Sequence, residues 1–259
     1  MENKGLEEIM PNRQAGSTQN MAGTGGESEP ESIIPRAIKT GTPGLDELLA
    51  IGGLQFKSTV LVSGEPGAGK SILALQFIYN GARLFGETGV YVTSEQSIDR
   101  VRHNAKSLGM DLSKFEENGL IKILKIPVTH GYEMAPDELM REIRKAEVTR
   151  VVIDSITPLE YLSSDIRSFR ANILHFLESI TARNVTLIAT AEKRKTDFDN
   201  VEFSPEDFLF DGLILMGRMR KAISFERVLS IVKMRGTKHS EELHPIEINS
   251  SGLVVKKAE

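Results

Sequence analysis

Residues 58–71 read Ser58-Thr-Val-Leu-Val-Ser-Gly-Glu-Pro-Gly-Ala-Gly-Lys-Ser71, a short apolar run that continues into a glycine-rich turn. The run at 58–63 is rich in β-branched side chains, which is typical of a buried strand. Residues 70–84 carry apolar side chains at helical spacing, so they predict a helix directly after the turn. A strand that passes into a helix in this way begins a β–α–β unit, which indicates an α/β fold.

The turn from Gly64 to Ser71 has the spacing G-x-x-x-x-G-K-S. Its glycines permit backbone angles that side chains forbid, so successive N–H groups can converge on phosphate oxygens beside the positive end of the helix. The alternative is a glycine-rich turn with an incidental lysine, but the strand before it and the helix after it favour a phosphate site. We expect Lys70 to reach the β- and γ-phosphates of ATP and the Ser71 hydroxyl to ligate Mg²⁺. The expected nucleotide-binding residues here are Glu65, Pro66, Gly67, Ala68, Gly69, Lys70, Ser71 and Ile72.

Strand and helix patterns alternate along most of the remaining chain. The alternation predicts a mostly parallel central sheet flanked by helices, joined by right-handed crossovers, with ligand sites at the carboxyl ends of the strands. Past Arg227 short strands follow without long helices, which indicates a C-terminal antiparallel element. The predicted strands are residues 89–94, 120–126, 150–154, 185–190 and 212–217, and the predicted helices are residues 97–108, 136–146 and 167–183.

Two carboxylates follow predicted strands at the edge where ligands should bind. Asp154 ends the strand 150–154 and can hold Mg²⁺ through water if that strand neighbours the one before the phosphate loop. A turn cap is the alternative role for Asp154. Glu95 follows the strand 89–94 and could orient or deprotonate the water that attacks the γ-phosphate, or could cap the next helix.

Lys233 and Arg235 alternate along an extended segment, so their side chains point the same way. They could clamp phosphate charge. A solvated basic strand face is the commoner explanation for such a pair.

Composition narrows the class of protein. The 259 residues include no cysteine, which excludes disulfides, thiol catalysis and cysteine metal sites, and the net charge of −4 gives no excess positive field for nucleic acid or lipid. No apolar run approaches the roughly 20 residues of a membrane span, and the N-terminus lacks an apolar signal core, so we expect a soluble cytoplasmic protein. Residues 1–35 are rich in Gly, Ser, Asn, Gln and Glu and predict a flexible tail, followed by one domain over 36–259.

Several motifs, taken in order, resemble the KaiC branch of the RecA-like ATPases from about Ile38 to Val255. Beside the phosphate loop, they are Thr42-Pro-Gly-Leu-Asp-Glu-Leu-Leu49, Gly52-Gly-Leu, Tyr91-Val-Thr-Ser-Glu-Gln96, Val152-Ile-Asp-Ser-Ile156 and Lys233-Met-Arg-Gly-Thr237. The resemblance is to single-domain archaeal or bacterial KaiC proteins or to the RadA-paralog type. It implies a RecA-like phosphate-loop NTPase core with ATP and Mg²⁺ as its cofactors.

The resemblance also implies roles for individual residues. Family members usually have two adjacent glutamates where this chain has Glu95 and Gln96, and an amide cannot accept a proton as a carboxylate does, so we expect slow hydrolysis. Residues matching Lys233 and Arg235 reach the γ-phosphate held by a neighbouring protomer. Further matched positions lie near the sugar and base of the nucleotide, and they are Ser107, Thr237 and His239.

A site completed in trans needs a head-to-tail interface, which closes into a ring when the rotation per subunit fits. The resemblance therefore implies a homohexamer in which Mg-dependent ATP binding and slow hydrolysis are coupled to assembly or to an unidentified protein partner. The clock proteins of the family carry two such domains and phosphorylate themselves. This chain has one domain, so autokinase activity is not expected.

Two other functions stay open. The first is that of a DNA-binding accessory protein of homologous recombination, of the RadA-paralog type. RecA-like relatives bind single-stranded DNA through two loops, which correspond here to residues 158–165 and 192–207. The charges of the second stretch largely cancel. Phe198, Phe203 and the adjacent Phe208 could stack on bases or simply pack, so DNA binding is possible but not favoured. The third function is a nucleotide-gated scaffold with little turnover, which Gln96 keeps open.

Overall fold

The computed structural model describes residues 36–126, 137–145, 147–163 and 165–258. The chain divides into two compact units, Met1–Ile33 and Ile34–Glu259, and the predicted tail of residues 1–35 lies outside the described residues. The first and last positions of the predicted helix 136–146 also lie outside them.

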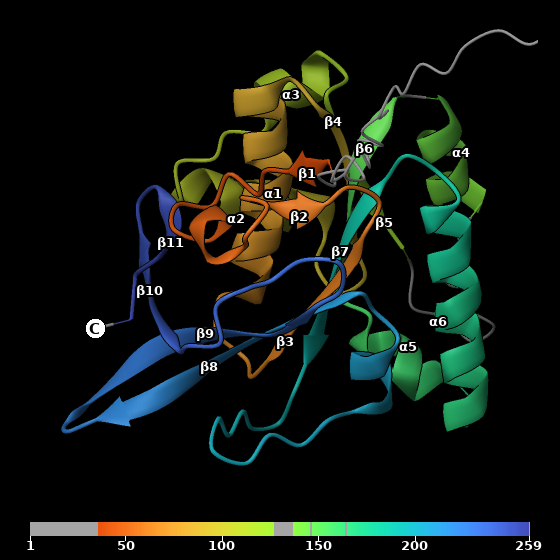
Figure 1. Ribbon diagram of the computed structural model, residues 1–259. Helices are drawn as coiled ribbons and strands as arrows, with labels where there is room; N and C mark the ends of the chain where they lie inside the picture. Colours follow the sequence, from red (N-terminus) through yellow and green to blue (C-terminus); the bar gives the residue numbers. More distant parts are fainter. Residues whose placement is uncertain (1–35, 127–136, 146, 164, 259) are drawn as a thin grey trace, which may run out of the picture. The chain divides into compact units, whose positions relative to one another are not determined.

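A nine-stranded sheet in the order β11-β10-β9-β8-β3-β7-β6-β4-β5 forms the centre of the described unit (Figure 1). The strands from β8 through β3 to β5 are parallel, whereas β8, β9, β10 and β11 pair antiparallel. This confirms the predicted mostly parallel sheet with a C-terminal antiparallel element. Its strands are β3 Thr59–Gly64, β4 Thr88–Thr93, β5 Ile121–Lys125, β6 Val148–Asp154, β7 Thr186–Glu192, β8 Gly212–Lys221, β9 Ser224–Met234, β10 His244–Asn249 and β11 Gly252–Val255; β1 Ala37–Ile38 pairs separately with β2 Leu54–Gln55.

Helices cover both faces of the sheet, and each face has its own apolar core (Figure 1). One group comprises α1 Lys70–Phe85, α2 Ile98–Ser107 and α3 Ser113–Glu117, and the other comprises α4 Asp137–Lys145, α5 Thr157–Leu162 and α6 Ile166–Thr181. Short 3₁₀ helices lie at η1 Asp46–Leu48 and η2 Pro205–Phe208. Among the described helices, none has the length and apolar character needed to cross a bilayer.

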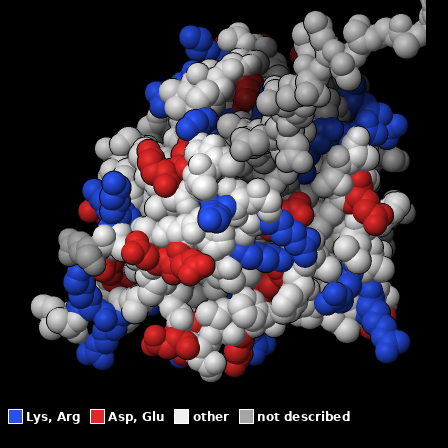
Figure 2. Space-filling view, in the orientation of Figure 1, with Lys and Arg blue, Asp and Glu red and all other residues white. Residues whose placement is uncertain are grey.

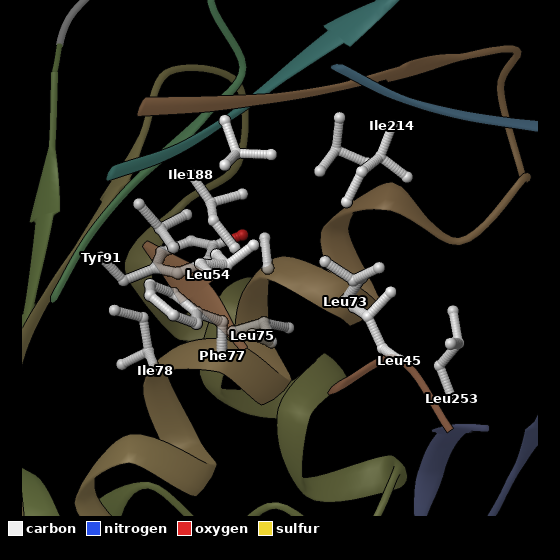
Figure 3. Packing of buried hydrophobic residues seen from close by; sticks show 14 of the residues in the cluster. Leu45, Leu54, Leu73, Leu75, Phe77, Ile78, Tyr91, Ile188, Ile214 and Leu253 are labelled. Carbon is white, nitrogen blue, oxygen red and sulfur yellow. The ribbon is translucent and has the colours of Figure 1, made fainter. Parts of the chain in front are cut away.

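Strand β3 is buried along its whole length because both faces of the sheet are covered. Side chains alternate across a strand, so Val60 and Val62 enter the core of α1, whereas Leu61 enters the opposite core. Figure 3 shows Leu73 and Phe77 of α1 packed toward the sheet in the same core as Ile214. This packing on both sides holds the end of β3, and with it the turn into α1, in one place.

A buried arginine, Arg150, links α1 to two other segments of the chain. Arg150 of β6 is fully buried, and its guanidinium pairs with Glu87 at 2.5 Å and donates to the carbonyls of Phe77 at 2.9 Å and Lys39 at 2.8 Å. A buried charge costs free energy unless it is paired and hydrogen-bonded. These three partners meet that requirement and join α1, its C-terminal loop and the entry segment.

The structure corrects one expectation about the strands and answers one question that the sequence left open. The antiparallel region begins before Arg227, because β8 and β9 form one long hairpin whose outer residues are mostly exposed and so lack a buried-strand pattern. Figure 2 shows Lys and Arg side chains over the projecting end of this hairpin at the lower left. In addition, β3 and β6 are not neighbours, since β7 lies between them.

Candidate nucleotide-binding site

The glycine-rich turn joins β3 to α1 at the carboxyl edge of the parallel strands. Gly69 forms the N-cap of α1 with φ of 110°, a left-handed conformation that glycine adopts without steric cost. At Gly64 an added Cβ would lie 1.9 Å from the Met216 carbonyl oxygen of β8. Glycine at these two positions therefore lets the turn fold tightly against the sheet and leaves its N–H groups at the start of the helix.

Lys70 lies at the centre of the site and is only 7% exposed. Its Nζ donates to the carbonyls of Gly64 at 2.9 Å and Glu65 at 3.1 Å. Burial lowers the pKa of Lys70, and the nearby carboxylates, first Glu192 and then Asp154, raise it in opposition. The ammonium group is thus held against the loop, within a ring of negative charge.

Asp154 is fixed by three hydroxyl groups from three elements. Its Oδ1 accepts hydrogen bonds from Ser71 at 3.1 Å and Thr190 at 2.5 Å, and its Oδ2 accepts one from Tyr91 at 2.6 Å. Burial and the charge of Asp154 raise the pKa of Tyr91 well above its usual value, so this phenol stays a donor. Asp154 therefore meets Ser71 across the intervening strand β7.

The Ser71–Asp154 pair has the chemistry of a magnesium site. A hydroxyl and a carboxylate oxygen are hard ligands, and Mg²⁺ in nucleotide sites takes few protein ligands and keeps several waters. The two predicted metal ligands lie in direct contact at the phosphate-loop helix. The residues present therefore fit the ion that the sequence predicts.

Glu95 and Gln96 point to different neighbours. The Ser155 hydroxyl donates to Glu95 Oε1 at 2.7 Å, whereas the Gln96 Oε1 accepts from Asn104 of α2 at 2.9 Å. Glu95 is thereby held beside the residue that follows Asp154. Gln96 is hydrogen-bonded to α2.

A cavity of about 500 Å³ opens above the glycine-rich turn. Of the predicted loop residues, Glu65 and Ala68 do not line it. It is lined by Pro66, Gly67, Gly69, Lys70, Ser71, Ile72, Glu95, Gln96, Asp154, Ser155, Thr190, Glu192, Arg227 and Ile248. A second cavity of about 240 Å³ shares Ser71, Ile72 and Gln96 with it and contains Ser107. The structure thus gathers the predicted loop, metal and water-activating residues at one place, with Ser107 beside it.

Sequence reasoning missed two charged residues of this cavity. Arg227 of β9 donates from Nε to the Gly67 carbonyl at 3.0 Å, and its cross-strand partner Arg218 pairs with Glu65 at 3.5 Å. The predicted strand ended at residue 217 and further strands were expected only past Arg227, so the hairpin that carries both arginines was not predicted. Glu192 ends β7 at the same sheet edge as Asp154, and a longer predicted strand past 190 would have identified it.

Four predicted residues lie elsewhere, on the segment that ends β9. Gly64 is level with Met216 on β8, whereas Met234 is level with Gly212, so the two positions differ by about 13 Å along the strands. Within one protomer this segment is therefore remote from the glycine-rich turn. It carries Lys233, Arg235, Thr237 and His239, and His239 lines a separate cavity of about 410 Å³ with Glu47 and His244.

The first of the two stretches considered for DNA binding differs from the expected loop, whereas the second keeps the expected balance of charge. Residues 157–162 form the helix α5 rather than a loop. In the second stretch Lys193 pairs with Asp207 at 2.8 Å and Lys195 with Asp197 at 3.2 Å, while Phe203 and Phe208 form an exposed aromatic pair. Two of its three basic side chains are thus paired with acids of the same stretch.

Together, the sheet order, the glycine-rich turn and the Ser71–Asp154 contact define a RecA-like phosphate-loop nucleotide-binding domain. The family model described as "ATPase: KaiC" matches residues 38–259. The chain belongs to the KaiC family of ATPases, and this membership supports nucleotide binding and ATPase activity.

Known relatives agree with this assignment. The chain is 34% identical to a UPF0273 protein of Pyrococcus furiosus over 85% of this chain and 94% of that protein. It is 32% identical to the circadian clock oscillator protein KaiC of Thermostichus vulcanus over 86% of this chain, and it spans 45% of that relative's length. The crystal structure of a KaiC-like protein from Pyrococcus horikoshii OT3 covers 86% of this chain and 100% of its own, with 34% identity and a TM-score of 0.75.

Proposed function

We propose that the chain binds Mg-ATP at the glycine-rich turn and hydrolyses it slowly at the interfaces of a head-to-tail homohexamer. The observation that carries the proposal is the separation of the basic segment with Lys233 and Arg235 from the phosphate loop of the same protomer. Two half-sites at opposite strand ends suit an assembly in which each protomer supplies one half to its neighbour.

The phosphate-loop half would bind the nucleotide. Backbone N–H groups at the start of α1 would receive phosphate oxygens, and Lys70 would exchange its loop carbonyls for the β- and γ-phosphates. Ser71 and Asp154 would hold Mg²⁺, which supplies neutralisation of phosphate charge. Arg227 reaches the same loop from β9 and adds positive charge within the protomer.

Glu95 would orient the attacking water and accept its proton. Ser155 fixes one carboxylate oxygen at 2.7 Å and leaves the other free for water. Gln96 cannot share this role, because its oxygen accepts from Asn104 and an amide is not a base. A single carboxylate where relatives have two is the reason to expect slow turnover.

The second half would come from the adjacent protomer. Lys233 and Arg235 would stabilise charge on the transferring phosphoryl group, as trans arginines do in other phosphate-loop enzymes. Thr237 and His239 on the same segment would approach the sugar and base. Ser107 would approach the base from the protomer that holds the phosphates, through the cavity it lines.

The replacement Arg235→Ala tests the composite site. We expect steady-state phosphate release to fall by about 100-fold or more while ATP affinity stays within a few-fold, because a trans arginine acts mainly in the transition state. Solution mass should be measured with ADP, with a nonhydrolysable ATP analogue and without nucleotide. Unchanged hydrolysis by Arg235→Ala, or a protein that stays monomeric with every nucleotide, contradicts the proposal.

Mixing variants separates a trans arginine from one that acts in its own protomer. Glu95→Gln should bind ATP without hydrolysing it, while its Arg235 stays intact. In mixed rings with Arg235→Ala, about a quarter of the interfaces would pair an intact loop with an intact arginine. Activity of the mixture above the sum of its parts supports the trans role.

A nucleotide-gated scaffold is the second candidate, favoured by the Gln96–Asn104 contact that joins the site to α2. It predicts nucleotide-dependent assembly with phosphate release that Glu95→Gln leaves unchanged. That result would replace hydrolysis by nucleotide sensing as the function, with an unidentified protein as the partner.

A further inference from the structure

Asp211 lies between β8 and the segment that carries Arg235. It directly precedes β8, and because Gly212 pairs with Met234, Asp211 faces Arg235 across the antiparallel ladder. The Arg235 N–H donates to the Asp211 carbonyl at 3.0 Å, and Arg235 Nη1 lies 3.6 Å from Asp211 Oδ1. The backbone and the carboxylate of Asp211 therefore both contact the arginine.

The other carboxylate oxygen of Asp211, Oδ2, is hydrogen-bonded to β3. Asp211 Oδ2 accepts hydrogen bonds from the Thr59 N–H at 3.0 Å and the Thr59 hydroxyl at 2.9 Å. The Asp211 N–H donates in turn to the Thr59 carbonyl at 2.9 Å. Thr59 is buried at the start of a fully buried strand, so it holds the carboxylate in one orientation. One oxygen is locked and the other faces Arg235.

Arg235 needs such support because its side chain is 61% exposed. A long exposed arginine samples many rotamers and loses that freedom when it binds phosphate. Lys233 lies close by, and burial together with the charge of Arg235 lowers the pKa of Lys233, while Asp211 and Asp207 oppose this effect. Negative charge at Asp211 thus keeps two neighbouring cations together at this edge of the protomer.

We infer that Asp211 is a positioning residue that holds Arg235 toward the phosphates bound by an adjacent protomer. The inference rests on the composite site proposed above. Asp211 is bonded to Thr59, which begins the strand that ends at the protomer's own phosphate loop. The carboxylate of Asp211 therefore contacts both the arginine that would act in the adjacent protomer's site and the strand that leads to the protomer's own phosphate loop.

The replacement Asp211→Asn tests the role. Asparagine keeps the shape and an oxygen that can accept from Thr59, but it removes the charge that attracts Arg235. We expect kcat for phosphate release to fall about 10-fold, as for a misplaced catalytic group, with KM for Mg-ATP changed less than about 2-fold. Asp211→Glu should recover part of the loss, since it restores the charge. The matched control Glu247→Gln, on β10, removes an ion pair with Lys256 and should leave kcat unchanged.

Mixing Asp211→Asn with Glu95→Gln separates positioning from damage to the protomer's own loop. If Asp211 acts through Arg235, the phosphate loop of the Asp211→Asn protomer is intact. An arginine from a neighbouring Glu95→Gln protomer then restores activity above the sum of the parts. If mixing rescues Arg235→Ala but not Asp211→Asn, the composite site stands and the role of Asp211 is overturned. Rescue of neither variant contradicts the composite site itself. Wild-type kcat for Asp211→Asn also overturns the inference.

Discussion

The two ends of the parallel strands carry basic side chains suited to phosphate, and these two sites are built in opposite ways. We call them the phosphate-loop edge and the opposite edge. At the phosphate-loop edge Lys70 is buried, hydrogen-bonded to its own loop and surrounded by carboxylates. At the opposite edge Arg235 is mostly exposed and has one ion pair at 3.6 Å. The first edge is organised by the fold of one protomer, whereas we propose that the second offers its charge to an adjacent protomer.

The difference indicates where each edge gains its function. Buried charges must find partners inside the protein, and Lys70 has done so. Exposed ion pairs contribute little to stability, typically below about 1 kcal/mol, so the pair of Arg235 with Asp211 is not there mainly to stabilise the fold. A change at the first edge should therefore remove nucleotide binding, and a change at the second should spare it.

The largest effect is expected for Lys70→Met. Methionine fills the buried space but cannot neutralise phosphate charge, so ATP affinity should fall by about 100-fold or more, a loss of roughly 3 kcal/mol. Isothermal titration calorimetry on folded protein measures this loss. An ATP affinity close to that of the wild type would show that the loop is not the phosphate site, and the distinction between the two edges would then be wrong.

The next effect separates two carboxylates at the phosphate-loop edge. Glu95→Gln should reduce kcat by about 100-fold or more, because general base catalysis typically contributes 10²- to 10⁴-fold. Glu192→Gln is the matched variant, since Glu192 lines the same cavity and faces Lys70. We expect a smaller loss in kcat for Glu192→Gln. The opposite order in a phosphate-release assay would transfer the water-activating role to Glu192.

A moderate effect is expected from the arginines of the β8–β9 hairpin. Arg227→Ala removes the cation that contacts the loop at Gly67 and should weaken ATP binding about 10-fold, as for one charge-assisted contact. Arg218→Ala on the paired strand loses only an exposed ion pair with Glu65 and should change affinity less. Calorimetry measures the ATP affinity of both variants. Equal affinities would show that Arg227 of the hairpin does not contribute to nucleotide binding.

The smallest effect concerns pH. Because burial lowers the pKa of Lys70, the unfolded chain binds more protons than the folded chain between that lowered pKa and the usual value near 10.5. The contribution of Lys70 to the free energy of unfolding should therefore rise with pH through this window and stay constant below it. The difference in Tm between wild type and Lys70→Met should shift by a few degrees at most. A difference independent of pH would show that Lys70 is not desolvated.

Local pattern predicted the phosphate-loop edge well. Glycine spacing, a preceding apolar run and a following amphipathic segment are neighbours in sequence, and they meet in space for that reason. Asp154 was predicted because it ends a strand, but its distance from the phosphate loop depended on whether β3 and β6 are neighbours, and they are not. Its contact with Ser71 forms across β7, a relation that strand order alone decides.

The amino-acid sequence by itself determined the strand, the glycine-rich turn and the helix start, because their backbone geometry depends on residues adjacent in the chain. It also determined the alternation that makes the sheet mostly parallel. Only the tertiary structure decided that Arg227 and Glu192 face the loop, and that Arg235 lies at the far strand end beside Asp211. Strand order comes from packing between segments that are distant in the chain, so the pattern within one segment does not specify it.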